Sequence, residues 1–400
     1  MRAQHTAHSF PAFPVYSCAF IADDQVVVGA GGGASRTGIK NKLRLFRVSD
    51  DRQLHTLSEL ELEKDEDAPM SMTAHPQSRT LVCGINSSAE KLQKGENENC
   101  RKFSVSTDEQ KFAQLATCGT LTPGSLDDYQ RVTVLSPNSK YLVAAGAHDF
   151  SLLDYDTLSP VIPSVRVSEG EIYDATFSLS RLFLATSSKL FVYALPTHPD
   201  GDESSSMQST SDNKQLDVIK TIELPSISGV PSRSNVTFRA ARLHPTRHDT
   251  LYTVVNATLP RVKHEKFAKK RAYVLKWKIS EKDASLDVYI ETIRKVCDGN
   301  LTCFDVSSDG RLLAFGASDY SLGVLDSNTL TPLLSILKAH EFPVTTLRFS
   351  PTSKLLVSGG VDSSIRVVSI PEILGGQSWN AIIFVIIGIL IIIIAVLMPR

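Results

Sequence analysis

The sequence has few cysteines, and they form no pattern typical of a metal site or a disulfide framework. Six cysteines are scattered over 400 residues, without a Cys-x-x-Cys pair or a dense group of histidines. Neither a structural zinc site nor a set of disulfides is therefore favoured, and a reducing compartment is the simpler interpretation.

The chain also has no excess of either charge and no apolar run at its N-terminus. Lys plus Arg is 42 and Asp plus Glu is 43, so nothing in the overall balance indicates a nucleic acid or another polyanion as partner. The first residues contain no continuous apolar run of the length found in secretory signals. We expect synthesis in the cytosol.

Motifs of enzymes and nucleotide-binding proteins are missing or incomplete. Gly29, Gly31 and Ala34 fit the spacing of the dinucleotide fingerprint, but a further loop and a strand follow where that motif needs a helix. Gly33 and Gly38 have the spacing of a phosphate-binding loop, yet Ile39 stands in place of its lysine. No Gly-x-Ser-x-Gly nucleophile motif occurs. We therefore expect no covalent catalysis and no nucleotide binding by this chain alone.

One long apolar run is present near the C-terminus. Residues 381–398 read AIIFVIIGILIIIIAVLM, without a charged residue, and would span about 27 Å as a helix. Trp379 stands where an interfacial anchor is common. The run predicts a single transmembrane helix after a short linker, residues 372–380. Since only Pro399 and Arg400 follow it, we expect a tail anchor inserted after synthesis, with residues 1–371 in the cytosol.

The rest of the chain contains a repeated pattern of short strands. Each unit has an alternating apolar segment, a polar turn, a short apolar strand ending in small residues and another alternating strand, which is typical of a propeller blade. The pattern predicts an all-β fold, a seven-bladed WD-repeat-type β-propeller over residues 1–371. The seven units cover residues 15–48, 69–105, 129–157, 171–195, 235–279, 301–326 and 344–368.

These repeats are degenerate, and the Trp-Asp dipeptide itself is absent. The last unit lacks an outer strand, which we expect from the N-terminal residues 5–12. Six or eight blades remain open alternatives, because residues 196–234 are long enough to contain a strand; within them, about 199–214 is expected to be a disordered loop. His340 and Asp362 are interpreted as the structural hydrogen-bonding pair of a WD repeat and not as catalytic residues.

The first unit contains the most informative feature, a glycine-rich loop over residues 29–42. It is longer than an ordinary blade turn and places three consecutive glycines, Gly31, Gly32 and Gly33, before the next strand. Their carbonyl oxygens, with the side-chain oxygen of Asn41, are suitable ligands for a monovalent cation such as potassium. Ile39 is the one large apolar residue between Val28 and Leu43 and would be held out for a partner. The residues alone also allow a flexible surface loop.

A strand followed by AGGGASRTGIKNKL, in a WD-type propeller with a C-terminal membrane span, resembles one family. It is similar to the endoplasmic-reticulum exchange factors for the Sar-family GTPase, which start COPII coat assembly for transport from the endoplasmic reticulum to the Golgi. The resemblance implies potassium contacts from Gly31, Gly32, Gly33 and Asn41. It also implies that Ile39 and Asn41, with Gly38 and Lys40, contact the GTPase.

The resemblance further implies a mechanism without covalent chemistry, in which the propeller favours the nucleotide-free GTPase and so promotes GDP release. It implies an endoplasmic-reticulum membrane location, with the propeller facing the cytosol and other coat or exit-site proteins as further partners. The alternative is a tail-anchored scaffold without exchange activity. A basic segment, residues 261–278, is interpreted as a solvated hairpin, with anionic lipid or an acidic partner face as the alternative.

Overall fold

The computed structural model describes residues 4–35, 37–122, 127–196, 216–263, 265–282 and 285–371. The predicted linker 372–380, the predicted span 381–398 and the predicted loop 199–214 lie outside these residues. Over the ranges that the structure describes, no helix is long and apolar enough to cross a membrane.

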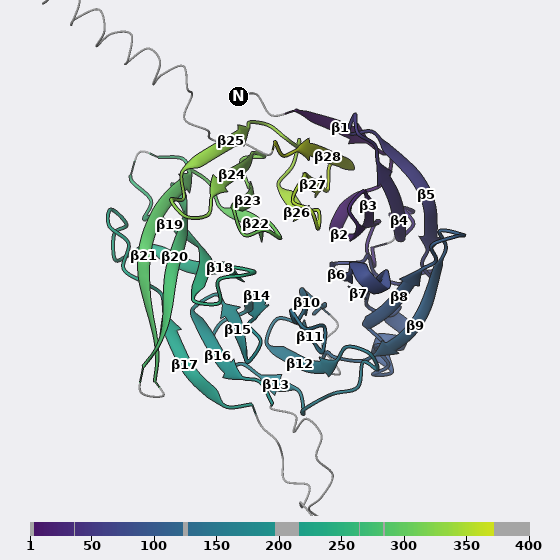
Figure 1. Cartoon of the computed structure of the whole chain (residues 1–400), viewed down its shortest axis with the longest axis horizontal. Helices are drawn as coiled ribbons and strands as arrows, with labels where there is room; N and C mark the ends of the chain where they lie inside the picture. The colour runs from purple at the N-terminus through teal and green to yellow at the C-terminus, as the bar shows by residue number, and fades with distance from the viewer. Residues whose placement is uncertain are drawn as a thin grey trace, which may run out of the picture.

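The described chain forms seven four-stranded antiparallel sheets around a central channel (Figure 1), so the prediction of seven blades is confirmed. In each blade the strands follow one another outward from the channel. The first three blades contain β2(Val15–Ala22), β3(Gln25–Ala30), β4(Lys42–Val48) and β5(Leu54–Glu61); β6(Ser71–His75), β7(Thr80–Gly84), β8(Cys100–Val105) and β9(Phe112–Cys118); and β10(Val132–Leu135), β11(Tyr141–Ala145), β12(Asp149–Asp154) and β13(Val165–Arg166). Blade 2 also carries the 3-10 helix η1(Pro76–Ser78) and the short helix α1(Ala89–Gln93).

The remaining four blades repeat this order. They contain β14(Ile172–Phe177), β15(Arg181–Thr186), β16(Lys189–Ala194) and β17(Val218–Glu223); β18(Asn235–Leu243), β19(Thr250–Thr258), β20(Lys270–Lys282) and β21(Ser285–Cys297); β22(Leu301–Val306), β23(Leu312–Ala317), β24(Leu322–Asp326) and β25(Pro332–Ile336); and β26(Val344–Phe349), β27(Leu355–Gly360), β28(Ser364–Ser369) and β1(His5–Ser9). Within residues 196–234, the described part, 216–234, supplies one strand, β17, to blade 4, and the described strands make seven blades.

The ring closes through the N-terminal strand. β1 pairs with β28 in an antiparallel register in which His5 faces Val368 and Ser9 faces Ser364. This confirms that the outer strand of the last blade comes from the N-terminal segment, although the strand ends at Ser9 and not at Ala12. The pairing joins the two ends of the propeller and leaves β28 without a free edge.

The hydrophobic core is divided among the contacts between neighbouring blades. Each of its seven clusters joins two adjacent sheets, because the alternating residues of every strand point to both faces of a blade. The cluster between blades 7 and 1, for example, combines Val357 and Ile365 with Phe20 and Phe46. The predicted alternation of short strands is therefore the sequence signature of this packing.

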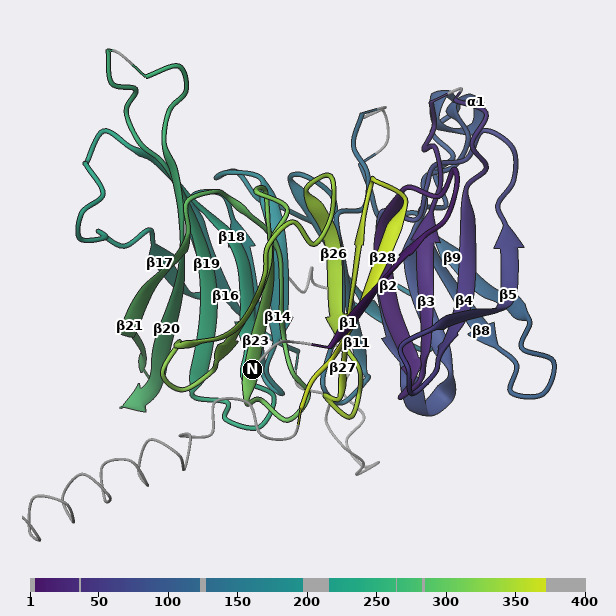
Figure 2. The same cartoon turned by 90° about the horizontal axis from the view of Figure 1, so that it is seen from above.

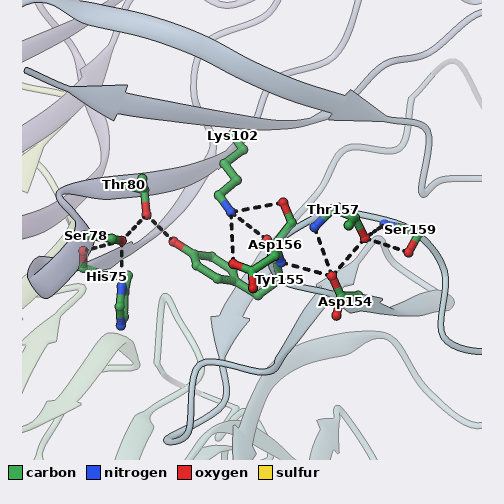
Figure 3. Close-up of polar contacts among 9 residues, drawn as sticks. All are labelled: His75, Ser78, Thr80, Lys102, Asp154, Tyr155, Asp156, Thr157 and Ser159. Atoms are coloured by element: carbon green, nitrogen blue, oxygen red, sulfur yellow. Dashed lines mark hydrogen bonds and ion pairs between the residues drawn. The ribbon is translucent and has the colours of Figure 1, made fainter.

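A polar network supplements the core between blades 2 and 3 (Figure 3). Tyr155 lies after β12 and its hydroxyl is 2.6 Å from the Thr80 hydroxyl of β7. The Lys102 ammonium donates to the Tyr155 carbonyl at 2.8 Å and lies 4.0 Å from the centre of its ring. Lys102 is only 5% exposed, and burial lowers its pKa. These contacts satisfy the buried polar groups and so stabilise the blade interface.

The turn drawn beside this network recurs elsewhere in the chain. The Asp154 carboxylate accepts hydrogen bonds from the backbone and hydroxyl of Thr157 (Figure 3). Asp326 and Thr329 make the same contacts in blade 6. The matching segments LDYDTL and LDSNTL are therefore two copies of one structural turn, which supports the interpretation of the chain as a degenerate repeat.

Candidate functional site

The glycine-rich loop lies on one face of the propeller, which we call the upper face. β3 ends at Ala30 and β4 begins at Lys42, so the loop covers residues 31–41 and is shorter than the predicted 29–42. The same face carries the connection from β5 to β6, residues 62–70, and the segment with α1. Figure 2 shows α1 at one end of this face and the extension between β19 and β20 rising from its other end.

Asn41 holds the loop together from inside. Its side-chain oxygen accepts the Gly33 backbone N–H at 2.9 Å, and its amide group donates to the Gly33 carbonyl at 3.1 Å and to the Glu66 carbonyl at 2.6 Å. The side chain is buried, with the residue 9% exposed. Asn41 therefore connects the loop to the segment after β5, and its predicted contact with a GTPase stays a prediction.

The glycines are needed for this close approach. Gly31 has a φ of +150°, and a Cβ there would lie 2.1 Å from the Asn41 side-chain oxygen. A Cβ on Gly32 would lie 2.1 Å from the Thr37 hydroxyl, and Gly33 has a φ of +71°, a conformation that favours glycine. The loop is therefore a packed and hydrogen-bonded structure over its described residues, and the alternative of a merely flexible excursion is not favoured.

Asp67 and Glu66 complete the support from the neighbouring segment. The Asp67 carboxylate accepts two backbone N–H groups, that of Ala34 at 3.0 Å and that of the next residue, Ala68, at 2.8 Å. Burial raises the pKa of Asp67 despite these two hydrogen bonds. Glu66 is buried and forms an ion pair with Arg101 at 2.7 Å, which fixes this segment to β8. Both acidic residues were missed by the sequence analysis, although the run Asp65-Glu66-Asp67 after a strand was a visible signal.

The other predicted contact residues lie on the outer side of the loop. Ile39 is half-buried and not fully extended into solvent, because its Cβ lies close to Gly32. Lys40 is exposed and forms an ion pair with Glu61 at 2.6 Å, and Gly38 has open space around it. Ile39 borders an open cavity of about 660 Å³ between the loop and residues 61–66.

The proposed potassium ligands lie close to one another, but most of their oxygens already accept a hydrogen bond. The Gly32 carbonyl accepts the Ser35 hydroxyl at 2.6 Å, while the Gly33 carbonyl and the Asn41 oxygen take part in the bonds described above. Carbonyl, amide and carboxylate oxygens are the ligand types that hard cations prefer, and such oxygens can accept a hydrogen bond and bind an ion together. The half-buried Asp67 carboxylate adds a negative charge with no ion pair among the described residues. The donor set therefore fits a hard monovalent cation.

A clustered side-chain metal site is not found in the described ranges, where no three His, Cys, Asp or Glu side chains come together.

His340 and Asp362 do lie together, with 3.3 Å between the His Nδ1 and a carboxylate oxygen. The His340 ring also contacts the hydroxyls of Ser358 and Ser364 at 2.9 and 2.8 Å. All these groups belong to the last blade, so the predicted structural role of the pair is confirmed.

The predicted basic segment starts in the extension between β19 and β20 and continues into β20. Phe267 and Val262 are 75% and 56% exposed there, and Lys266 lies 5.5 Å from the centre of the Phe267 ring. Lys276 and Lys278 belong to the blade itself and form ion pairs with Glu291 and Asp249. Only the first part of the basic segment is therefore a solvent-facing extension.

Comparison with known proteins agrees with this architecture. A family described as "WD domain, G-beta repeat" matches residues 331–369, the outer strand of blade 6 and most of blade 7. The guanine nucleotide-exchange factor SEC12 of Candida glabrata is 22% identical over 92% of this chain and 73% of its own length. A putative guanine nucleotide-exchange factor, SED4 of Saccharomyces cerevisiae, is 22% identical over 90% of this chain.

The matches differ in how much of the relatives they cover. The chain spans only 30% of the Saccharomyces SED4 protein and 33% of its Candida glabrata counterpart. SEC12-like protein 2 of Arabidopsis thaliana is 38% identical over 73 residues, which are 18% of this chain and 19% of that protein. The similarity to proteins named as guanine nucleotide-exchange factors thus extends over nearly the whole chain, and the described residues form a seven-bladed propeller that matches a WD repeat in its last two blades.

Proposed function

We propose that this protein is a guanine nucleotide-exchange factor for a Sar-family small GTPase at the endoplasmic-reticulum membrane. The observation that carries the proposal is the glycine-rich loop, which is held in shape by Asn41 and Asp67 and presents Ile39 beside an open cavity. Relatives named as guanine nucleotide-exchange factors support it. GTP loading would then start COPII vesicle formation for transport to the Golgi.

The proposed mechanism is a difference in affinity between two states of the GTPase. A loop that is already folded loses little conformational entropy on binding, so its contacts can favour the nucleotide-free GTPase over the GDP-bound form. Ile39 would supply the apolar contact, while Asn41 and Asp67 keep the loop in the binding conformation. No bond to the nucleotide is made or broken by the exchange factor.

The test is the rate of GDP release from a Sar-family GTPase in the presence of the full chain. We expect Ile39→Ala to lower the maximal rate at least tenfold, because loss of an apolar hot spot at the centre of a contact costs about 2 kcal/mol or more and every 1.4 kcal/mol is about tenfold. Leu179→Ala is a matched control, since Leu179 is 59% exposed in the turn between β14 and β15, on the opposite face. An equal rate for wild type and Ile39→Ala would contradict the proposal. Binding of the GTPase without any acceleration would instead support the scaffold alternative.

The cation proposed for the loop is potassium. Its ligands would be the carbonyl oxygens of Gly31, Gly32 and Gly33 and the Asn41 side-chain oxygen, with the Asp67 carboxylate nearby. The bound ion would supply a positive charge that these oxygens share, which would make the loop more rigid. We expect GDP release to slow when choline replaces potassium at constant ionic strength, and Asp67→Asn to reduce this dependence. Equal rates in both salts would contradict the proposal.

The membrane part of the proposal rests on residues 381–398. We propose that this run anchors the protein in the endoplasmic-reticulum membrane as a single span, with the propeller in the cytosol. Its length and lack of charge are typical of a transmembrane helix. Anchoring would place the exchange reaction where the activated GTPase inserts its own amphipathic segment.

A further inference from the structure

The mouth of the central channel on the upper face is lined by residues from all seven blades. It forms an open cavity of about 330 Å³, and its lining includes Tyr16, Met70, Arg131, Tyr173, Arg239 and Thr345. The inner strands β2, β6, β10, β14, β18, β22 and β26 surround this channel in Figure 1. The cavity has room for one or two side chains but not for a folded element.

Five β-bulges shape this mouth. Where the inner strand of a blade pairs with the second strand, the register skips one residue near the start of the inner strand in blades 1, 4, 5, 6 and 7. The skipped residues are Tyr16, Tyr173, Arg239, Thr302 and Thr345, and all five line the mouth. A bulge redirects the side chain of its extra residue, so the blades repeatedly turn this one position toward the channel.

Two guanidinium groups, those of Arg131 and Arg239, lie at the mouth. The Arg239 guanidinium lies 5.2 Å from the centre of the Tyr173 ring, and within the described part of the chain no carboxylate or hydrogen-bond acceptor pairs with it. Arg131 forms an ion pair with Glu171 at 2.6 Å, but its Nε is buried without a hydrogen-bond partner among the described residues. The Arg131 Nε also lies 3.8 Å from the Asp128 carboxylate, so the arginine at the mouth that can take an acceptor supplied from outside is Arg239.

The charges at the mouth are also unbalanced. Two arginines and no carboxylate line it, although Glu171 and Asp128 approach Arg131 from the side. The arginines deeper in the channel are paired, Arg242 with Asp174 and Arg348 with Asp305. Among the described arginines of the channel, Arg239 is therefore the one without an ion pair, and it lies over the Tyr173 ring.

The mouth and the glycine-rich loop are neighbours on one surface. Asp67 accepts the Ala34 N–H of the loop, while burial and, secondarily, the charge of the same carboxylate raise the pKa of Tyr16 at the mouth. Met70, three residues further along the chain, lines the mouth. A protein domain that covers the loop would therefore also reach the mouth.

We infer that the mouth receives an aspartate or glutamate side chain of the GTPase that docks on the upper face, with Arg239 as its main partner. The inference rests on the proposed function and adds a second contact to it. An Arg side chain stacked on a tyrosine and facing a carboxylate is a common anchor at protein interfaces. The contact would increase affinity for the GTPase, whereas the loop would accelerate GDP release.

The test compares two kinetic quantities for the full chain in detergent micelles. The rate of GDP release is measured against the concentration of exchange factor, which gives a maximal rate and a half-maximal concentration. We expect Arg239→Ala to raise the half-maximal concentration about tenfold with little change in the maximal rate, and Arg239→Lys to raise it less. Ile39→Ala should instead lower the maximal rate. Arg311→Ala is the control, because Arg311 is exposed in the turn between β22 and β23 on the opposite face.

A steeper loss of affinity with added salt for wild type than for Arg239→Ala would further support the contact. If wild type accelerates GDP release and Arg239→Ala behaves like Arg311→Ala, the inference alone is overturned. If wild type leaves GDP release unchanged, the proposed function and the inference fall together. A melting temperature for Arg239→Ala equal to that of wild type would confirm that the variant is folded.

Discussion

Asn41 is the residue that joins the glycine-rich loop to the rest of the upper face. Its three hydrogen bonds hold Gly33 and the Glu66 carbonyl, which belong to two segments of the chain. These bonds use the side-chain amide group and one acceptor position of the side-chain oxygen. Asn41 therefore fixes the position of Ile39 and of the loop carbonyl groups.

Replacement of Asn41 tests this role. We expect Asn41→Ala to lower the maximal rate of GDP release at least tenfold, because the loop loses its internal partner, and to destabilise the propeller by only about 1–3 kcal/mol. Exchange assays and urea denaturation give the two numbers. Asn328→Ala is the control, since Asn328 is exposed in the turn between β24 and β25 on the opposite face. Normal exchange by Asn41→Ala would show that loop shape is not required.

His340 provides a prediction about pH. Burial lowers the pKa of His340 below its usual 6.5, against the opposing effect of Asp362. The unfolded chain therefore takes up a proton at a higher pH than the folded chain, and the free energy of unfolding falls as pH drops below about 6.5. The lowered pKa of Asp362 adds nothing to this window, because its contribution is lost only around and below 3.8.

Urea denaturation between pH 7.5 and 5.5 measures this dependence. His244 has a lowered pKa for the same main reason, burial, and contributes with the same sign. His340→Gln should be less stable at pH 7.5 and show a weaker pH dependence than wild type. A free energy of unfolding that stays constant over this range would contradict the assignment.

At the scale of single elements, β1 is the strand that closes the ring. Its five residues pair with β28, and His8 and Phe10 add contacts to the Arg52 carbonyl and the Ser363 carbonyl. Without β1, the backbone groups along the outer edge of β28 would lose their partners and leave a free sheet edge.

Removal of residues 1–9 should therefore destabilise the propeller by several kcal/mol, at roughly 1 kcal/mol for each lost hydrogen bond. The measurement is urea denaturation of the shortened chain. A synthetic peptide of residues 4–12, added in excess, should restore part of the stability by pairing with β28, whereas a peptide of the same composition in scrambled order should not. Unchanged stability after the deletion would mean that β1 does not close the ring in solution.

At the scale of the whole molecule, the upper face gathers the features that the proposed function needs. The glycine-rich loop, the supporting residues 62–70 and the mouth of the channel lie together there. β28, the last strand before the predicted anchor, runs away from this face, because its connection from β27 has the same place in the blade as the β3–β4 connection that carries the loop. The propeller thus separates the proposed exchange surface from the point at which the chain continues toward the predicted span.

Removal of residues 372–400 tests the anchor. We expect the full chain to float with liposomes in a density gradient and the shortened chain to remain in the soluble fractions. Exchange in detergent should be unchanged, whereas exchange on liposomes should be slower for the shortened chain. An unrelated apolar span of equal length in place of 381–398 should restore flotation. Flotation of the shortened chain would contradict the assignment of this segment as the anchor.

Much of the architecture could be predicted because its signals are local and repeated. Alternating apolar residues, the turns between them and the unpaired last unit predicted seven blades and the closing strand, whereas six or eight blades stayed open until the structure placed β17 as the outer strand of blade 4. The loop between β3 and β4 was also visible, since three glycines in a row stand out in one short segment. What that loop does was indicated by resemblance, because a run of glycines by itself fits several kinds of site.

Other features depended on contacts between distant residues. Asn41 meets Glu66 only because β4 and β5 turn back on each other, and Asp67 reaches Ala34 for the same reason. The mouth of the channel combines residues from Tyr16 to Thr345, each placed by a bulge or by the start of an inner strand. The sequence by itself determined the blades, the long loop and the apolar run, because periodicity and composition are local properties. The tertiary structure decided which side chains meet on the upper face, because those meetings follow from closure of the ring.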